Sequence, residues 1–431
     1  MLSTAPGRRV AIVAGVRTPF VKAGTVFRNI SAIDLGRLTV AELLQRSGID
    51  GKEVQALVFG TVIPSVIAPN IAREVSLIPQ LPKGVEAFTV SRACTSANQA
   101  ITDGADQIAL GHYDVVVAGG SESLSNVPIL HSPGFAEALV TASKAKSLGK
   151  RLQAFAQIRP KDLVPIAPAI AEPSTGETMG QSAEKMAKIN HIPREEQDRY
   201  ALGSHQKAAA GTKDGRLTKE IFPVFVPPKY ETAQTDDNGI RVDSSYEALA
   251  KLPPVFDRRY GTVTAGNSSP LTDGAGAVVL MSEARAKASG IQPLGFIRSY
   301  AYAALDPGEQ LLMGPVLAAP VALKRAGLSL GEMDLVEMHE AFAAQVLCNL
   351  RGFESRQWAE RAGFSHPVGA VDPAKLNVMG GSIAIGHPFG ATGARITTTL
   401  LNELRRRDGQ FGLMTVCAAG GMGFAMVVER A

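Results

Sequence analysis

Residues 413–421 read Leu413-Met414-Thr415-Val416-Cys417-Ala418-Ala419-Gly420-Gly421, an apolar run that ends in small residues. Far upstream, residues 114–120 read Asp114-Val115-Val116-Val117-Ala118-Gly119-Gly120 and have the same character. A short apolar run that stops at glycine predicts a buried strand. The likeness of the two runs indicates an internal repeat, so we expect a chain built from two similar halves.

Strands and helices alternate around both runs. Before the first run, short apolar stretches predict strands and stretches with helical spacing predict helices: strands at residues 9–15, 56–60 and 86–90, helices at 32–48 and 96–110. The strand before Cys94 has a counterpart at residues 376–378, which precede a loop with His387 and a helix from Gly393. Residues 57–60 match 335–338 in position, and a further strand is expected at 276–280. This alternation predicts an α/β fold with a parallel or mixed sheet.

The alternation stops between about residues 127 and 255, where proline and charged residues become frequent. Helices dominate there, most clearly at residues 181–189 and 194–209. We expect an inserted helical lobe at 127–255. The first half then comprises residues 1–126 with 256–284, and the second half residues 285–431.

A basic stretch lies inside this lobe. Six cations occur without an intervening acidic residue: Lys144, Lys146, Lys150, Arg151, Arg159 and Lys161. Apolar side chains alternate with them at helical spacing: Leu148, Leu152, Phe155 and Ile158. One interpretation is a solvated basic helix packed on the lobe, and the other is a helix that binds an anion, a membrane surface or a partner.

Composition excludes several classes of protein. The chain has 431 residues and a net charge of +4, which is too small to indicate nucleic-acid binding. Three cysteines in this length do not form a disulfide scaffold and fit a reducing compartment. No apolar stretch approaches the ~20 residues needed to span a bilayer, and residues 1–9 contain no apolar signal core. We therefore expect a cytoplasmic location.

Two cysteines and a histidine are candidates for chemistry. Cys94 lies between a predicted strand and a helix, where the helix N-terminus favours a thiolate and the amides could form an oxyanion hole. The alternative for Cys94 is a small buried residue that only packs. His387 is framed by glycines, and Pro388 holds it extended, so its ring is expected to project from a loop. Cys417 follows a strand, and a second thiol could move a proton.

Other polar positions are weaker candidates. His339 and Glu340 follow an apolar run and could polarise a carbonyl, or could only cap a helix. Cys348 lies within a predicted helix and is expected in the core. Residues 261–270 form a small polar loop that could contact a ligand, and its glycines match neither a dinucleotide fingerprint nor a P-loop. No Cys/His spacing suits zinc, so we expect no metal site.

Taken together, these segments resemble the thiolases. They occur in family order over nearly the whole chain, at residues 17–20, 91–96, 118–123, 178–180, 183–184, 261–273, 339–342, 380–388 and 417–423. Within the family the pattern most resembles the β-subunit of the fatty-acid β-oxidation trifunctional enzyme and its bacterial relatives. His339, where most thiolases have Asn, and the basic stretch at residues 144–161 point to that branch.

The resemblance implies a fold and a set of residue roles. It implies two βαβαβαββ halves in a five-layered αβαβα core, with a loop lobe that holds coenzyme A. Cys94 takes the place of the acylated nucleophile, His387 of the base and Cys417 of the acid that protonates the leaving enolate. His339 and His387 would form one oxyanion hole, and the N–H groups of Cys94 and Ala419 the other. Ala419 replaces a common Gly, which should keep the N–H and narrow the site.

Further implications concern ligands and partners. Ser269, Ala265 and Met179 match positions along the pantetheine path, and Phe342 belongs to the same binding region. The implied reaction is thiolytic cleavage of a 3-ketoacyl-CoA through an acyl-cysteine, with coenzyme A as co-substrate and no permanently bound cofactor. The implied partners are a second copy, a hydratase/dehydrogenase α-subunit, and a membrane contacted through the stretch from Lys144 to Lys161.

Three alternatives share parts of this pattern. A biosynthetic thiolase would run the reverse condensation with the same residues. A ketoacyl-carrier-protein synthase has the same architecture but should lack a second catalytic cysteine, so Cys417 argues against it. A lipid carrier of this fold would form no covalent acyl adduct.

Overall fold

The computed structural model describes residues 8–156, 158–166 and 171–431. Residues 1–7, which make up most of the segment in which no signal core is expected, therefore lie outside the described residues. The first half has the order β-α-β-α-β-α-β-β, as expected. Its elements are β1 (Val10–Arg17), α1 (Ala32–Ser47), β3 (Ala56–Gly60), α2 (Ile71–Ser76), β4 (Glu86–Val90), α3 (Ser96–Ala109), β5 (Val115–Glu122) and β8 (Thr272–Ser282).

The second half repeats this plan. Its elements are β9 (Gly295–Ala304), α10 (Gly314–Ala326), β10 (Leu335–Met338), α11 (Ala343–Phe353), α12 (Arg356–Arg361), α13 (Ser382–Ile385), α14 (Thr392–Arg407), β11 (Phe411–Ala418) and β12 (Met422–Arg430). A short helix, α9 (Glu283–Ala288), connects the halves, and β2 (Val21–Lys22) pairs with β8.

The strands form one twisted sheet in the order β10-β11-β12-β9-β1-β8-β5-β3-β4. Within each half the pairing is equivalent, since β3–β5 and β10–β11 are parallel whereas β5–β8 and β11–β12 are antiparallel. The halves join where Ala11 pairs with Phe296 and Ile12 with Gly295, between β1 and β9. The internal repeat is therefore a repeat of strand topology.

One strand of the second half is reduced to a single bridge. Residues 376–378, expected to match β4, pair with β10 only through Leu376 and Val336. Asn377 has a positive φ of 44°, and its side chain accepts from the Met338 N–H at 2.7 Å and donates to the Met338 carbonyl at 2.8 Å. A side-chain amide thus takes the hydrogen bonds that a neighbouring strand would make.

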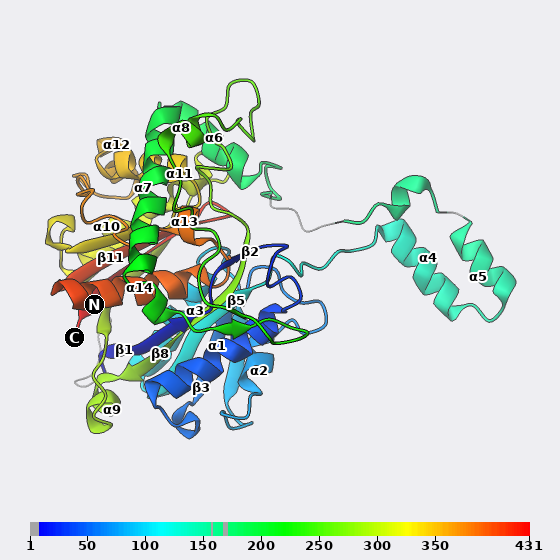
Figure 1. Cartoon of the computed structure of the whole chain (residues 1–431), viewed down its shortest axis with the longest axis horizontal. Coiled ribbons are helices and arrows are strands. Elements are labelled where there is room, and N and C mark those ends of the chain that lie inside the picture. The colour runs from blue at the N-terminus through cyan, green and yellow to red at the C-terminus, as the bar shows by residue number, and fades with distance from the viewer. Residues whose placement is uncertain (1–7, 157, 167–170) are drawn as a thin grey trace.

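Helices cover the sheet in layers (Figure 1). The first half packs α1 and α2 on one face, and the second half packs α10 on β9 and β12. Helices α3 and α14 contact each other and lie between the two halves, with α14 touching both β11 and β8. The strands of the two halves, although joined in one continuous order, thus form two layers with α3 and α14 between them, and the expected five-layered α/β/α/β/α core is confirmed.

Local sequence signals set the helix ends. The Ser31 side chain accepts a hydrogen bond from the Asp34 N–H at the start of α1, and Gly48 ends the helix with a φ of 68°. A hydroxyl N-cap and a left-handed glycine are the preferred terminators of a helix. Residues 32–48 were therefore readable as a helix to within one residue.

The inserted segment between β5 and β8 consists of two different parts. Helices α6 (Met179–Ile189), α7 (Arg194–Lys213) and α8 (Tyr246–Ala250) lie on the body, where α6 and α7 pack on α11. Helices α4 (Pro133–Lys144) and α5 (Leu148–Phe155) form a hairpin that projects away from it (Figure 1). A small ribbon of β6 (Val224–Phe225) and β7 (Ala233–Gln234) completes the insertion. The bounds 127–255 stay a prediction.

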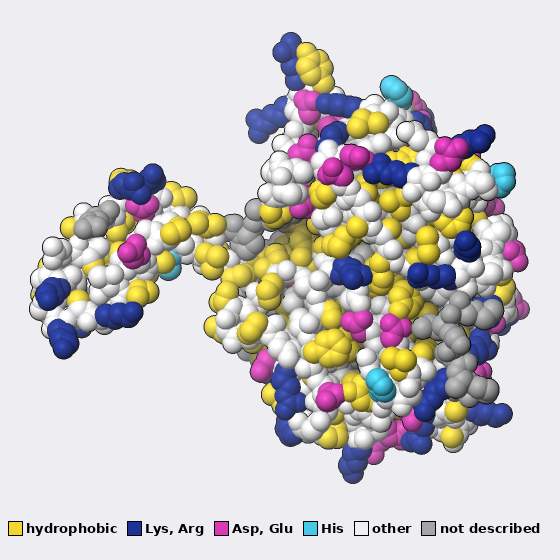
Figure 2. Space-filling view, turned by 180° about the vertical axis from the view of Figure 1, so that it is seen from behind, with side chains coloured by type: hydrophobic (Ala, Val, Ile, Leu, Met, Phe, Trp, Pro, Cys, Tyr) yellow, Lys and Arg dark blue, Asp and Glu magenta, His cyan; other side chains and the backbone are white. Residues whose placement is uncertain are grey.

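The basic stretch lies on this hairpin. Helix α5 buries no residue and packs on α4, which is itself part of the inserted segment, so both interpretations of the basic stretch stay predictions. Apolar side chains on it are exposed, with Leu148 at 73% and Leu152 at 64%. The projecting hairpin of α4 and α5 displays both hydrophobic and basic side chains on the face seen in Figure 2. Among the described residues, no helix has the length and apolar character to cross a membrane.

A buried ion network ties the lobe to β1. The Arg17 guanidinium is fully buried and donates to Glu220 at 2.7 Å and to both Asp237 oxygens at 2.7 and 2.9 Å.

Replacing Arg17 with leucine is expected to lower the free energy of unfolding by about 3–5 kcal/mol, because two carboxylates would stay buried without their cation. Chemical denaturation measures this. Arg356→Leu, which removes an exposed pair with Glu360, is the control and should have a much smaller effect. Equal losses in the two variants would contradict the prediction.

Candidate active site

Cys94 lies in the turn between β4 and α3. Ala93 has a φ of 45°, a strained value for a residue with a side chain. The Ser96 hydroxyl holds this turn, since it accepts from the Arg92 N–H at 2.8 Å and donates to the Ala93 carbonyl at 2.7 Å. The thiol is thereby presented beside the first turn of α3, as the sequence predicted.

His387 reaches Cys94 from the second half. Its Nε2 lies 3.2 Å from the Cys94 Sγ, and its Nδ1 lies 2.6 Å from the Thr392 Oγ1. The Thr392 hydroxyl donates its proton to the Pro388 carbonyl, so its oxygen accepts from His387 Nδ1–H. The free lone pair of His387 is therefore on Nε2 and faces the thiol, which is the arrangement of a base beside a nucleophile.

His339 stands next to His387. It follows β10, is fully buried, and its ring centroid lies 4.2 Å from that of His387. Its Nδ1 lies 3.0 Å from the Ser382 Oγ, whereas its Nε2 is buried without a hydrogen-bond partner among the described residues. A buried polar atom without a partner is costly, so this nitrogen is a candidate contact for a substrate oxygen.

Cys417 and Ala419 complete the site from β11 and the turn after it. Cys417 is buried, and burial followed by the nearby Cys94 sulfur raises the pKa of the Cys417 thiol well above its ordinary value. The Ala419 N–H and the N–H of Cys94 itself interact with the Cys94 sulfur. The structure thus brings together five predicted residues from segments far apart in the chain: Cys94, His339, His387, Cys417 and Ala419.

The resting pair of Cys94 and His387 is uncharged. Burial raises the pKa of the Cys94 thiol to about 12, although the two N–H groups oppose part of this rise. Burial, with the positive charge of Arg395, lowers the pKa of His387 to about 3. Both shifts disfavour the charged forms, so the pair holds a thiol and a neutral imidazole near neutral pH.

Alkylation of Cys94 by iodoacetamide should report this state. Because only the thiolate reacts and its pKa is raised, the rate constant should climb about tenfold per pH unit between about pH 6 and 9 without levelling off. Peptide mass spectrometry after timed quenching measures the rate at Cys94, with an unstructured model thiol as reference. A plateau below the pKa of that reference thiol would instead indicate a thiolate–imidazolium pair.

Glu340 does not face the site with its neighbour His339. Its carboxylate accepts hydrogen bonds from four groups: Tyr200 Oη, Ser204 Oγ, Asn377 Nδ2 and the Ile383 N–H. These partners join α7 to residues 377–383. Glu340 therefore fixes the backbone that leads to His387, and the interpretation of Glu340 as a group that polarises a carbonyl is not supported by this geometry.

Glu122 was not singled out from sequence. This buried carboxylate ends β5 and accepts from the N–H groups of Val62, Ile63 and Gly390. Burial raises its pKa to about 7 despite these bonds. It connects the loop after β3 to the loop after His387. The feature of the sequence that could have identified Glu122 is its position as an acidic residue at the end of an otherwise apolar strand.

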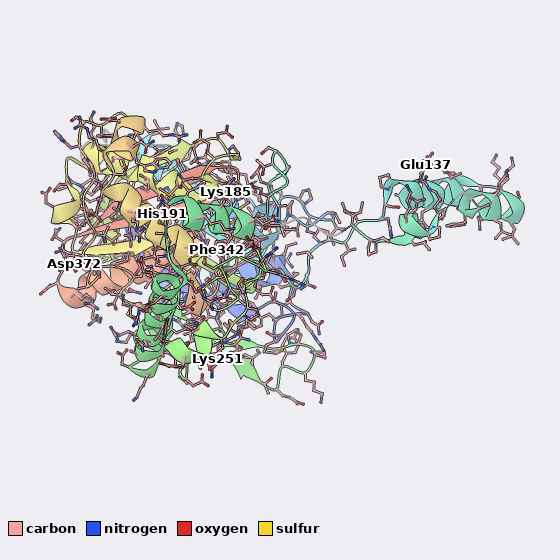
Figure 3. The ribbon with its side chains drawn as sticks, turned by 90° about the horizontal axis from the view of Figure 1, so that it is seen from above. Glu137, Lys185, His191, Lys251, Phe342 and Asp372 are labelled. Carbon is pink, nitrogen blue, oxygen red and sulfur yellow. The ribbon has the colours of Figure 1, made fainter. Side chains whose placement is uncertain are left out.

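The residues expected along the pantetheine path lie in neighbouring segments. The Ser269 N–H donates to the Ala341 carbonyl at 2.9 Å, next to Phe342. Phe342 meets Phe256 edge to face, and Met179 packs against the same core, whereas Ala265 is exposed. Figure 3 shows Phe342 on the body, far from Glu137 on the projecting hairpin. The ligand roles of these four residues stay predictions.

The expectation of no metal site depended on sequence spacing. Among the described residues, ligand atoms of Cys94, His339 and His387 lie within 4.8 Å of one another, a cluster that spacing in the chain did not reveal. All three side chains belong to the site described above. The absence of a metal remains a prediction.

Comparisons with known proteins agree with this geometry. The thiolase N-terminal domain model matches residues 10–284, and the thiolase C-terminal domain model matches residues 291–430. The 3-ketoacyl-CoA thiolases of Yersinia enterocolitica and Yersinia pestis are each 51% identical over 429 residues, covering 99% of this chain and 98% of the relative.

Solved structures of thiolase-type enzymes also resemble this chain over nearly its whole length. Human mitochondrial 3-ketoacyl-CoA thiolase in complex with CoA superposes with a TM-score of 0.82 at 33% identity, covering 99% of both chains. The Bacillus anthracis acetyl-CoA acetyltransferase gives a TM-score of 0.84 at 33% identity, covering 98% of this chain and 99% of that one. Because family models match both halves, this chain belongs to the thiolase family.

Proposed function

We propose that this chain is a 3-ketoacyl-CoA thiolase that cleaves its substrate with coenzyme A during fatty-acid degradation. The observation that carries the proposal is the 3.2 Å contact between His387 Nε2 and Cys94 Sγ, with the Cys417 thiol close enough to Cys94 for the two sulfurs to interact. Relatives with that name match at 51% identity over 99% of the chain. The enzyme is therefore an acetyl-CoA C-acyltransferase.

The first half-reaction makes the acyl-enzyme. His387 Nε2 takes the proton of Cys94, and the sulfur attacks the C3 ketone. The C2–C3 bond breaks, its electron pair forms the enolate of acetyl-CoA, and Cys417 gives C2 a proton. The N–H groups of Cys94 and Ala419 face the sulfur that is acylated, where they can stabilise the oxyanion at C3.

The second half-reaction releases the product. The proton held by His387 first passes to the Cys417 thiolate, so that both groups return to their starting forms. Coenzyme A then loses its thiol proton to His387, attacks the acyl-Cys94 thioester, and leaves as an acyl-CoA shortened by two carbons. The Cys94 sulfur, released as a thiolate, takes that proton back from His387. A covalent intermediate shared by two half-reactions predicts ping-pong kinetics. No metal or bound cofactor enters these steps.

The test is thiolysis of 3-ketoacyl-CoA substrates from short to long acyl chains, followed by loss of the substrate enolate absorbance. Cleavage with ping-pong kinetics supports the proposal, and no cleavage of any chain length refutes it. Incubation with acetyl-CoA alone measures the reverse condensation, so a large excess of condensation over thiolysis would favour the biosynthetic alternative.

We further propose that the chain belongs to the branch of the trifunctional β-subunit. His339 at the position usually held by Asn and the α4–α5 hairpin support this assignment. The corresponding partner would be a hydratase/dehydrogenase α-subunit in the cytoplasm. Co-purification with such a subunit after co-expression tests the assignment, and two separate peaks in gel filtration would contradict it.

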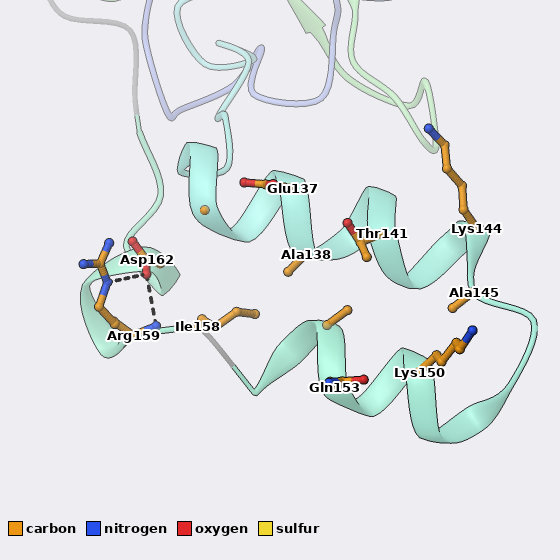
Figure 4. A pocket seen from close by; sticks show the side chains of 12 residues that line it. Glu137, Ala138, Thr141, Lys144, Ala145, Lys150, Gln153, Ile158, Arg159 and Asp162 are labelled. Atoms are coloured by element: carbon orange, nitrogen blue, oxygen red, sulfur yellow. Dashed lines mark hydrogen bonds and ion pairs between the residues drawn. The ribbon is translucent and has the colours of Figure 1, made fainter.

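The hairpin has the composition of a surface for anionic membranes. A groove of about 860 Å³ separates α4 from α5, and Lys144 and Lys150 lie near the same end of it, one on each helix (Figure 4). Exposed Leu148 and Leu152 lie on the same helix as Lys150 and Arg151. Apolar side chains flanked by cations favour adsorption to anionic lipid.

Vesicle flotation tests this contact. With Lys150→Glu and Arg151→Glu combined, binding to anionic vesicles should fall by at least about tenfold, because each cation near the surface contributes about 1 kcal/mol. A matched double variant on the body, Lys287→Glu and Arg356→Glu, should bind like the wild type. If both double variants bound the anionic vesicles equally well, the membrane role would be refuted. It would also be refuted if the wild-type chain floated with the vesicles only when the α-subunit was present.

A second copy is expected to pair along β4. This strand is at one end of the sheet and is its least buried long strand, with Phe88 43% exposed, and Cys94 follows four residues after it. Unpaired edges that carry an apolar side chain favour pairing with another chain. Analytical ultracentrifugation should give a dimer for the wild type and a monomer for Phe88→Pro, and a wild-type monomer would contradict this.

A further inference from the structure

We propose that Ser382 and Arg395 are positioning residues that keep His339 protonated on Nε2, so that its imidazole donates a hydrogen bond to the thioester oxygen of the departing enolate. The inference depends on the proposed function for its chemical meaning. It adds two residues outside the predicted catalytic set, and it assigns a proton to one atom.

The Ser382 Oγ has two hydrogen-bond partners among the described residues, Arg395 Nη2 at 3.3 Å and His339 Nδ1 at 3.0 Å. A guanidinium only donates, so the Ser382 oxygen is the acceptor in the first contact. Its own proton then has one acceptor available, which is His339 Nδ1. With Nδ1 accepting, the proton of a neutral His339 must be on Nε2.

The opposite arrangement would be costly. If His339 Nδ1–H donated to Ser382, the buried hydroxyl would accept twice and its own proton would have no partner. Ser382 is fully buried, so that proton could not be solvated. Leaving a buried donor without a partner is costly enough to select one tautomer strongly.

Arg395 determines that Ser382 is the donor in its hydrogen bond with His339. Its side chain is 1% exposed and lies 3.6 Å from the buried Glu337 carboxylate, with Nε and Nη1 lacking hydrogen-bond partners among the described residues. Its cationic group faces Ser382 and acts on both histidines. Burial, followed by repulsion from a protonated His387 and from Arg395, lowers the pKa of His339 well below its ordinary value. The imidazole of His339 is therefore neutral and carries one proton, and the contact with Ser382 decides which of its two nitrogens holds that proton.

The same logic gives the neighbouring histidine the opposite tautomer. The Thr392 hydroxyl donates to the Pro388 carbonyl and accepts from His387 Nδ1–H, which leaves a lone pair on Nε2. Two adjacent imidazoles thus differ because one hydroxyl donates and the other accepts. One ring presents a base to Cys94, and the other presents the His339 Nε2–H to the substrate as a donor, a nitrogen with no hydrogen-bond partner in the described part of the chain.

A measurement on the wild-type enzyme tests the tautomer directly. The chain has seven histidines, so nitrogen-15 NMR of the histidine-labelled protein gives a small set of imidazole signals. The pair of imidazole nitrogen signals that is absent from the spectrum of the His339→Asn variant belongs to His339. We expect its Nε2 to carry the proton and its Nδ1 to be bare, and a protonated Nδ1 would overturn the proposal.

Kinetics of Ser382→Ala test the consequence. Without the hydroxyl, thiolysis kcat should fall about ten- to hundredfold, since an oxyanion donor is weakened rather than removed. Exchange of the acyl group between an acyl-CoA and labelled coenzyme A forms no enolate, so it should stay within about twofold of wild type. The proportion of the two His339 tautomers, measured by NMR, should also differ between this variant and the wild type. Loss of both reactions in parallel would show a structural defect and overturn the positioning role.

A matched variant controls for loss of a buried hydroxyl. Ser299 is buried on β9 and donates to the Ala322 carbonyl at 2.6 Å, away from the site. Ser299→Ala should keep wild-type ratios of thiolysis to exchange. If the wild type cleaves no 3-ketoacyl-CoA, the proposed function fails, while the NMR result still decides the tautomer. If Ser382→Ala does not fold, the wild-type spectrum decides alone.

Discussion

Replacing Cys94 with alanine should lower kcat for thiolysis by at least about 10⁴-fold, because the covalent route requires its sulfur and the remaining site offers only binding and oxyanion stabilisation. Steady-state assays with a 3-ketoacyl-CoA measure the loss. Intact mass spectrometry should show an acyl adduct on the wild type after mixing with an acyl-CoA and none on Cys94→Ala.

Cys348 provides the matched control for that experiment. It is fully buried in α11, and it packs in the core of the second half as expected from sequence. All three cysteines are free, so Cys348→Ala also removes a single buried thiol. It should keep near-normal kcat. Comparable activity in the Cys94 and Cys348 variants would refute the nucleophile and favour a carrier without covalent chemistry.

Cys417→Ala should separate the two kinds of chemistry in the site. Loss of a positioned proton donor is expected to reduce both cleavage and condensation by about 10²–10⁴-fold. Transfer of an acyl group between coenzyme A molecules should continue, because Cys94 and His387 keep their 3.2 Å contact. The comparison of thiolysis with acyl exchange measures this difference. An equal fall in both reactions would mean that Cys417 only supports the packing around Cys94.

Much of the fold was predictable because its strands are continuous apolar runs that end at glycine or proline. The runs that became β3, β5 and β11 carry this signal within their own residues. The pairing of Cys94 with His387 was also accessible, since the two residues precede the equivalent helices α3 and α14. A repeat in the sequence therefore contained information about a contact between residues far apart.

Other features depend on partners that no local pattern reveals. Residues 376–378 were expected to be a strand, but the Asn377 side chain takes the hydrogen bonds of a neighbouring strand. Glu340 follows a catalytic candidate yet turns toward α7. Ser382 is an ordinary helix-start serine in sequence, and its role emerges only when Arg395 and His339 are placed around it. These outcomes are set by tertiary contacts, which outweigh local preference.

The missing strand has a consequence for assembly. At the far end of the sheet, residues 375–377 cover Val336 of β10 with backbone hydrogen bonds, so that margin has no room for another chain's strand. Among the described residues, β4 is the other end strand of this sheet. Under the proposed pairing along β4, two copies would close on a twofold axis, and each would occupy the free edge of the other. Further strand addition would then be prevented at the opposite end, where an asparagine side chain stands in for a strand.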